Sequence, residues 1–177
     1  MKNIALILLL MLCLNSCKSS KGVTTKKTKD HKASEVVLNN FPKSADNKSD
    51  SLANSIIDFA KQFDGVKYKY GGTTKKGMDC SGLITTAFKS QDIMLPRSSK
   101  NMANIGSLIE IREVQKGDLL FFAIQKNSDT INHVGLVTDV RPGFVEFIHA
   151  TTSLGVIISS LAERYWHFAF VQARRIL

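Results

Sequence analysis

The sequence predicts an α+β domain, because residues with the apolar spacing of a helix come first and short apolar strands follow. One helix face is marked by apolar side chains at i, i+4, i+7, i+8 and i+11, namely Leu52, Ile56, Phe59, Ala60 and Phe63. From residue 119 onward, short apolar or alternating runs are separated by Gly, Pro, Asn and Asp, a pattern typical of an antiparallel meander. We therefore expect N-terminal helices packed on an antiparallel β-sheet of about five to six strands.

Three helices are expected before the strands. The first has Asp50 or Ser51 as its N-cap and ends at Gly65. A turn at the glycine pair 71–72 precedes a second helix that begins near Cys80, and a short third helix follows Pro96 over residues 98–104. The expected strands cover residues 119–124, 133–140, 144–150, 156–159 and 168–174.

The N-terminus has the pattern of a secretory signal. Lys2 precedes an apolar run of 11 residues, 4–14, whereas a membrane-spanning helix needs about 20. The run closes on Leu-Asn-Ser-Cys at residues 14–17, which resembles the lipobox of bacterial lipoproteins. The resemblance implies that residues 1–16 are a signal peptide and that Cys17 carries acyl chains such as palmitate; an ordinary cleaved signal with an incidental cysteine is the alternative. Because Lys18 is not an aspartate, the expected location is the cell envelope, anchored to the outer membrane and facing the periplasm.

Residues 17–50 are expected to form a lipidated, disordered and basic tether, followed by one domain at residues 51–177. The tether holds eight lysines against four acidic residues, and the chain as a whole has a net charge of +9. The secretory signal disfavours nucleic acid as a partner, so the charge indicates contact with anionic envelope polymers or lipid headgroups. Solubility of a lysine-rich linker explains the tether's charge equally well.

Cys80 is the candidate nucleophile. Cys13 and Cys17 belong to the signal region, which leaves one thiol in the domain and excludes a disulfide framework or a Cys-only zinc site. A lone cysteine is usually a small buried hydrophobe. However, Cys80 directly precedes a helical pattern, and the partial positive charge of a helix N-terminus favours the thiolate, so we expect an unusually acidic thiol.

Two histidines are candidate partners of Cys80. His133 opens one expected strand and His149 closes the next, so adjacent strands place both imidazoles at one end of the sheet, one as general base and the other as its orienting group. His31 lies in the tether, and His167 is expected to pack against or cap a strand. Spacing alone does not choose among the three domain histidines. A zinc site of Cys80, His133 and His149 is a weaker alternative, since no closely spaced ligand pair exists.

Six sequence blocks, found in one order, resemble those of NlpC-type cell-wall cysteine peptidases. The resemblance covers residues 51–174 and implies a papain-like fold, with Cys80 as nucleophile, His133 as base and His149 as the third polar residue. The blocks are Tyr68-Lys69-Tyr70-Gly71-Gly72, Asp79-Cys80-Ser81-Gly82-Leu83, Leu95-Pro96-Arg97-Ser98-Ser99, Gly117-Asp118-Leu119-Leu120-Phe121-Phe122, His133-Val134-Gly135 and His149-Ala150.

The resemblance also implies a substrate-binding set. Tyr68 matches a tyrosine beside the nucleophile, where it shapes the oxyanion site or binds substrate; a plain aromatic strand residue is the alternative. Asp79, Ser81 and Arg97 match positions that line the family's substrate groove, although Arg97 is equally compatible with a solvated residue at a helix start. Tyr70 departs from the family, which often has Trp there.

The function implied is a peptidoglycan endopeptidase that hydrolyses an amide bond in stem or cross-bridge peptides without a metal or organic cofactor. A non-catalytic wall-binding module is one alternative, and a thiol acyltransferase acting on lipid, as in circularly permuted relatives, is another. The order of Cys80 before His133 favours the peptidase. The oligomeric state is left open, with a monomer as the default expectation.

Overall fold

The computed structural model describes residues 43–125 and 128–177. These residues belong to one compact unit, Asn40–Leu177. The predicted signal peptide, the lipidation site Cys17 and the tether up to residue 42 lie outside the described residues. Within the described ranges, no helix is both long enough and apolar enough to cross a membrane.

The first helix, α2 (Lys43–Lys61), begins earlier than the sequence predicted. The expected N-cap at Asp50 or Ser51 is wrong, and residues 43–50 are helical rather than part of a disordered tether. No Gly or Pro interrupts the chain between Lys43 and Lys61, and extending a helix costs far less than starting one. The apolar residues of the later turns therefore stabilise the helix, which extends toward the N-terminus through polar residues that show no apolar periodicity.

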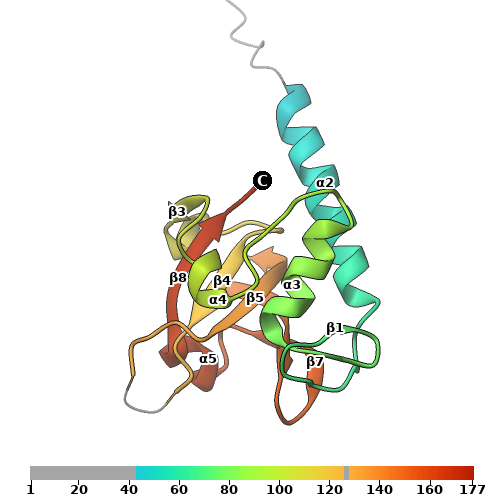
Figure 1. Ribbon diagram of the computed structural model, residues 1–177. Coiled ribbons are helices and arrows are strands. Elements are labelled where there is room, and N and C mark those ends of the chain that lie inside the picture. Colours follow the sequence, from blue (N-terminus) through green and yellow to red (C-terminus); the bar gives the residue numbers. More distant parts are fainter. Residues whose placement is uncertain (1–42, 126–127) are drawn as a thin grey trace, which may run out of the picture. The chain divides into compact units, whose positions relative to one another are not determined.

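The other helices confirm the predicted positions. A short hairpin of β1 (Thr73–Thr74) and β2 (Gly77–Met78) leads into α3 (Cys80–Lys89). The short helix α4 (Ser99–Met102) begins after Ser98, whose hydroxyl accepts the N–H of Asn101. Figure 1 shows α2 and α3 side by side on one face of the sheet, and both helices contact its central strand β5 (His133–Arg141).

The sheet is antiparallel and has six strands, as predicted. Its order is β3-β8-β4-β5-β6-β7. The strands β4 to β7 form a meander, and the chain then returns so that β8 pairs with the free edge of β4. A 3₁₀ turn at Ile111–Glu113 separates β3 from β4. The remaining bounds are β3 (Ser107–Ile109), β4 (Leu119–Phe122), β6 (Phe144–Thr151), β7 (Gly155–Ser160) and β8 (Phe170–Arg175).

Successive side chains along a strand point to opposite faces of the sheet, and each face carries its own hydrophobic core. Val134 and Ile148 pack beneath the helices, whereas their neighbours Phe122 and Phe147 pack on the opposite face. That second face is closed by α5 (Arg164–Ala169), through the buried Trp166. The sequence predicted no helix here and began the last strand at residue 168, two residues before β8 begins.

His167 does not pack or cap a strand as expected. It lies in α5 with its side chain exposed. A single turn of helix with Trp166 inward necessarily turns the next residue outward, because successive helical side chains are about 100° apart. His167 is therefore removed from the list of candidate partners for Cys80.

Candidate active site

Cys80 is the first residue of α3, as the sequence predicted. The preceding Asp79 is the N-cap, and its Oδ1 accepts the N–H of Gly82 at 2.7 Å. The Cys80 side chain is 9% exposed and packs in one cluster with Val134, whose backbone N–H acts to lower the pKa of the thiol. Because Val134 directly follows His133, this contact holds the thiol against the strand that carries the predicted base.

A network of charged hydrogen bonds fixes the Asp79 cap. Arg97 binds both carboxylate oxygens, with Nη1–Oδ1 at 2.9 Å and Nη2–Oδ2 at 2.8 Å, and Nη1 also donates to Ser81 Oγ at 2.7 Å. The N–H of Gly71 donates to Asp79 Oδ2 at 2.7 Å. Burial acts to raise the pKa of Asp79, but the bonds from Arg97, Gly82 and Gly71 outweigh it and hold the pKa below its usual 3.8.

Gly82 is required at the first turn of α3. A Cβ atom at this position would collide with the carbonyl oxygen of Gly72 and would lie 2.9 Å from Asp79 Oδ1. The loop before β1 thus approaches the helix backbone directly, which only glycine permits. This explains why the nucleophile sits in a Cys-Ser-Gly segment rather than before a bulkier helix former.

The two predicted imidazoles meet at one end of the sheet. His133 Nε2 lies 2.9 Å from His149 Nδ1, and both side chains are buried. His149 Nε2 lies 3.0 Å from the hydroxyl of Ser159 on β7. The predicted juxtaposition of the histidines is thus present, and Ser159 extends it by a residue that the sequence analysis did not single out.

Aromatic rings enclose the histidine pair. Trp166 stacks on His133 with ring centroids 5.3 Å apart and meets His149 edge-on at 4.5 Å. Phe122 and Phe147 complete the wall. The sequence analysis did not single out Trp166, because an aromatic run near the C-terminus gives no sign of which ring will face the histidines.

Burial sets the protonation states of the site. It lowers the pKa of His133 to about 4, and burial together with the nearby His133 lowers that of His149 to about 3. Burial also raises the pKa of the Cys80 thiol, and the Asp79 carboxylate adds to this, against the N–H groups of Val134, Ser81 and Cys80 itself. Burial thus favours the neutral thiol and the neutral imidazole, which contradicts the acidic thiol that the sequence predicted.

A pocket of about 390 Å³ opens over Cys80. The structure brings four of the residues predicted for substrate or oxyanion binding to its wall, namely Tyr68, Asp79, Ser81 and Arg97. Burial raises the pKa of the Tyr68 hydroxyl, and the nearby Cys80 and Asp79 act in the same direction. Their roles toward substrate stay predictions. Five residues outside the predicted substrate-binding set also line the pocket: Tyr70, Gly71, Ser98, Ser99 and Asn132.

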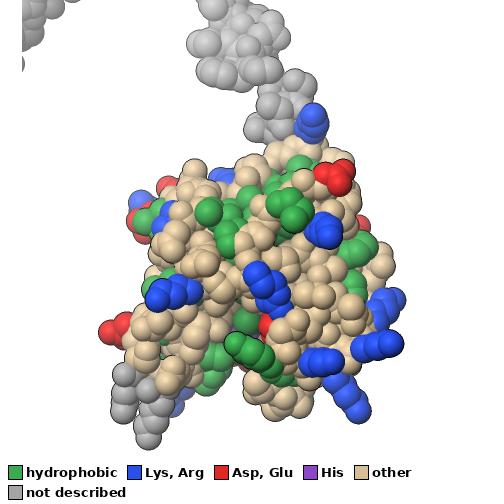
Figure 2. Space-filling model, in the orientation of Figure 1, with side chains coloured by type: hydrophobic (Ala, Val, Ile, Leu, Met, Phe, Trp, Pro, Cys, Tyr) green, Lys and Arg blue, Asp and Glu red, His purple; other side chains and the backbone are tan. Residues whose placement is uncertain are grey.

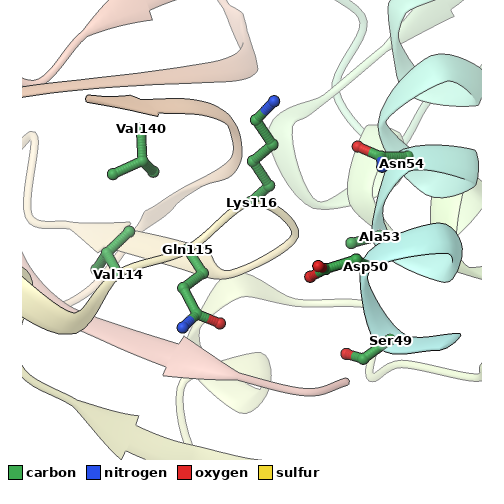
Figure 3. Close-up of a pocket in the computed structure, with 8 residues that line it drawn as sticks. All are labelled: Ser49, Asp50, Ala53, Asn54, Val114, Gln115, Lys116 and Val140. Carbon is green, nitrogen blue, oxygen red and sulfur yellow. The ribbon is translucent and has the colours of Figure 1, made fainter. Parts of the chain in front are cut away.

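A larger hollow, of about 650 Å³, lies between α2 and the loop before β4. Figure 3 shows Asp50 and Asn54 on the helix across from Gln115 and Lys116 on the loop. Neither a thiol nor an imidazole is among the residues that line it, and the Lys116 ammonium lies 3.6 Å from Asp139. Its size does not make it the reaction site. Across residues 43–125 and 128–177, no cluster of three His, Cys, Asp or Glu side chains is placed to hold a metal ion.

The chain was compared with known families and proteins. The model of the NlpC/P60 family matches residues 65–175, a span that holds Cys80, the histidine pair and the pocket. The chain belongs to the NlpC/P60 family. This confirms the family resemblance and the α+β fold predicted from sequence.

Curated relatives share much of this chain. A probable endopeptidase NlpC homologue of Haemophilus influenzae is 41% identical over 140 residues, which are 77% of this chain and 71% of the relative. The murein DD-endopeptidase MepS/murein LD-carboxypeptidase of Escherichia coli K12 is 36% identical over 180 residues, which are 98% of this chain and 89% of the relative. The similarity to the Escherichia coli protein therefore extends over nearly the whole of this chain and most of that one.

Solved structures of the family have the same fold. An NlpC/P60 protein from Bacillus cereus superposes with a TM-score of 0.63 at 31% identity, over 70% of this chain and 39% of that one. A Staphylococcus aureus protein described as similar to a lipoprotein gives 0.63 at 30% identity, over 72% and 42%. This chain thus spans less than half of either structure, and the similarity concerns the domain that carries Cys80.

Proposed function

We propose that this protein is a cysteine peptidase that hydrolyses an amide bond of peptidoglycan, with Cys80 as nucleophile, His133 as base and His149 as orienting group. The observation that carries the proposal is the placement of these three residues. The thiol lies at a helix N-terminus and packs in one cluster with Val134, the residue next to His133, and His133 Nε2 lies 2.9 Å from His149 Nδ1. The relatives named as endopeptidases support the reaction class.

The geometry identifies which ring nitrogen of His133 exchanges protons with Cys80 and the substrate. His133 Nε2 is occupied by His149, so Nδ1 is the atom that takes the Cys80 proton as the sulfur attacks the carbonyl carbon. The protonated imidazole then gives that proton to the leaving amine, which departs and leaves an acyl-enzyme. A water molecule adds to the acyl carbon, His133 accepts its proton, and the thiol is restored as the carboxylic product leaves. The backbone N–H of Cys80 and the Tyr68 hydroxyl are the proposed donors to the oxyanion.

Because burial favours the neutral thiol, proton transfer is proposed to accompany attack instead of preceding it. His149 then has a defined role, since its Nδ1 accepts the Nε2–H of His133 and stabilises the imidazolium that forms beside the substrate. The non-catalytic alternative is disfavoured because the complete set of groups is assembled and buried. The acyltransferase alternative rests on no observation in this structure.

The proposed bond is the D,D cross-link between stem peptides. The support is the murein DD-endopeptidase that resembles this chain over 98% of its length. The γ-D-glutamyl bond is the competing choice, because one relative is named a γ-D-glutamyl-L-lysine dipeptidyl-peptidase, although only 48% of this chain aligns with it. Basic side chains are spread over the face shown in Figure 2 and outnumber acidic ones there, which suits a polymer rich in carboxylates.

The proposed location is the periplasmic face of the outer membrane, with Cys17 lipidated and the domain held close to the wall. The support is the sequence pattern of a short apolar run that ends in Leu-Asn-Ser-Cys. Cys17→Ser is expected to change a membrane-bound protein into one recovered in the soluble fraction. Equal recovery of both forms with membranes would place the anchor elsewhere.

One experiment tests the proposed function. Purified sacculi are incubated with the protein and with its Cys80→Ala variant, and the released fragments are identified by mass. We expect fragments from the wild-type protein alone, with masses that correspond to cleaved cross-links. Release of fragments by Cys80→Ala would refute the nucleophile, and cleavage within single stem peptides would transfer the activity to the γ-D-glutamyl bond.

A further inference from the structure

The histidine pair ends on a polar group that the mechanism above does not use, the hydroxyl of Ser159. Ser159 is buried on β7, and its Oγ lies 3.0 Å from His149 Nε2. The other face of the same imidazole, through Nδ1, meets His133. Three neighbouring strands, β5, β6 and β7, therefore carry one continuous row of hydrogen-bonding side chains.

The row restricts where the protons lie. A neutral imidazole has one N–H and one free lone pair, so each ring donates from one nitrogen and accepts at the other. Under the proposed function, His133 needs its lone pair on Nδ1 to receive the Cys80 proton. Its N–H then lies on Nε2 and donates to His149 Nδ1. That nitrogen must be an acceptor, which places the N–H of His149 on Nε2, directed at Ser159 Oγ.

The opposite arrangement disables the base. If His149 carried its proton on Nδ1, it would donate to His133 Nε2, and the N–H of His133 would have to move to Nδ1. The lone pair would then point away from the thiol. The choice between the two arrangements depends on what His149 Nε2 meets.

Ser159 can serve either arrangement, because its hydroxyl donates as well as accepts, but only the productive arrangement depends on it. In the productive one, Nε2 bears a buried N–H, and an unpaired buried N–H costs more than an unpaired lone pair. Within the described part of the chain, the hydrogen-bond partner of His149 Nε2 is Ser159 Oγ, while the ring faces of Phe147 and Trp166 surround the imidazole. The hydroxyl thus supplies the acceptor that the productive arrangement needs.

We propose that Ser159 is a positioning residue that holds His149 in the Nε2–H tautomer and thereby keeps the Nδ1 lone pair of His133 directed at Cys80. The inference rests on the proposed function for its catalytic consequence. Its structural content, the tautomer of each ring, is measurable without substrate.

The test uses the full-length protein and two substitutions on neighbouring positions of β7. Ser159→Ala removes the acceptor. Ser160→Ala is the matched control, because it removes a serine hydroxyl one residue further along, which accepts the N–H of Ala162 and faces away from the histidines. Long-range ¹H–¹⁵N correlation spectra report which ring nitrogen of each histidine is protonated, and kinetics on cross-linked muropeptides give kcat and KM.

We expect the wild-type protein and Ser160→Ala to show Nε2–H tautomers at His133 and His149. In Ser159→Ala, part of the His149 population is expected to move its proton to Nδ1, with kcat falling about 10-fold, the equivalent of one lost buried hydrogen bond, and KM unchanged. Ser159→Thr keeps the hydroxyl and is expected to retain both the tautomer and kcat. It also serves as the readout if the alanine variant does not fold.

A double substitution isolates the tautomer effect. An amide has no imidazole tautomers, so in the His149→Asn background Ser159→Ala is expected to lower kcat less than it does in the wild type. An equal loss in both backgrounds would overturn the proposal, as would unchanged Nε2–H tautomers with a wild-type kcat in Ser159→Ala. A wild-type protein that shows the expected tautomers but releases nothing from sacculi would refute the proposed hydrolase and support the placement of the protons.

Discussion

Two substitutions of Asp79 separate its contribution as the N-cap of α3 from its contribution as the ion-pair partner of Arg97. Asp79→Asn keeps a side-chain oxygen for the cap, since Asn and Asp cap helices equally well. It turns Oδ2 into an amino group, which leaves one Arg97 nitrogen and the Gly71 N–H without their acceptor. The Arg97 side chain is 45% exposed, so water replaces its lost acceptor at a cost of about 1 kcal/mol, and the unpaired Gly71 N–H costs about another 1 kcal/mol. Asp79→Ala loses the same two contacts and also the cap of Gly82, worth about 1 kcal/mol.

We therefore expect Asp79→Ala to lower the free energy of unfolding by about 3 kcal/mol and Asp79→Asn by about 2 kcal/mol. Urea denaturation measures both. Arg97→Gln is the matched control, because it removes the ion pair but leaves the cap and the Gly71 hydrogen bond, and it should cost about 1 kcal/mol. Equal losses in the two Asp79 variants would show that the charge and not the cap stabilises this turn, which would refute the reasoning. Asp79→Asn should also lower the pKa of the Cys80 thiol, visible as faster alkylation at neutral pH, because the carboxylate raises it.

Further predictions concern the catalytic set and its surroundings. His133→Ala is expected to abolish turnover of sacculi nearly as fully as Cys80→Ala, whereas His149→Asn keeps measurable activity; complete loss in all three would mean that His149 takes part in proton transfer. Burial holds the pKa of His133 at about 4, below the 6.5 of the unfolded chain, so between these values the unfolded state binds a proton that the folded state excludes. Stability should be full above pH 6.5 and fall as pH drops toward 4, and urea titrations that give a flat profile would contradict this. Trp166→Ala opens the ring of His133 to water and should raise its pKa toward 6.5, measured by NMR titration. Gly82→Ala should give little folded protein, since the new methyl group collides with a backbone carbonyl; a stable variant with normal circular dichroism would show that the loop yields.

The helices and strands in which apolar residues recur at regular spacing were predictable from the sequence. Apolar spacing located α3 and most of α2, and alternation located the meander, because each pattern reports a single buried face. The elements without such a face were missed. Strand β3 has three residues at a sheet edge, and α5 is one aromatic turn in a segment whose side chains favour strands.

The candidate site was predictable where a residue type is rare and was missed where it is common. One cysteine and three domain histidines leave few combinations, and the family resemblance selected Cys80, His133 and His149 among them. Ser159 is one of many serines and carries no signal until β6 and β7 are paired. The acidity of Cys80 was predicted with the wrong sign, because the helix terminus is visible in the sequence whereas the depth of burial is not.

The packing of Cys80 in one cluster with Val134 joins the helical layer to the sheet, and it links the activity of the enzyme to its folding. A chain that has formed α3 alone has a thiol but no base, and a chain that has formed only the β5–β6 hairpin has paired imidazoles but no nucleophile. Neither part can cut a peptide. Because assembly requires contacts between residues far apart in the sequence, it comes late in folding. A hydrolase built this way is inert until the two layers have packed against each other.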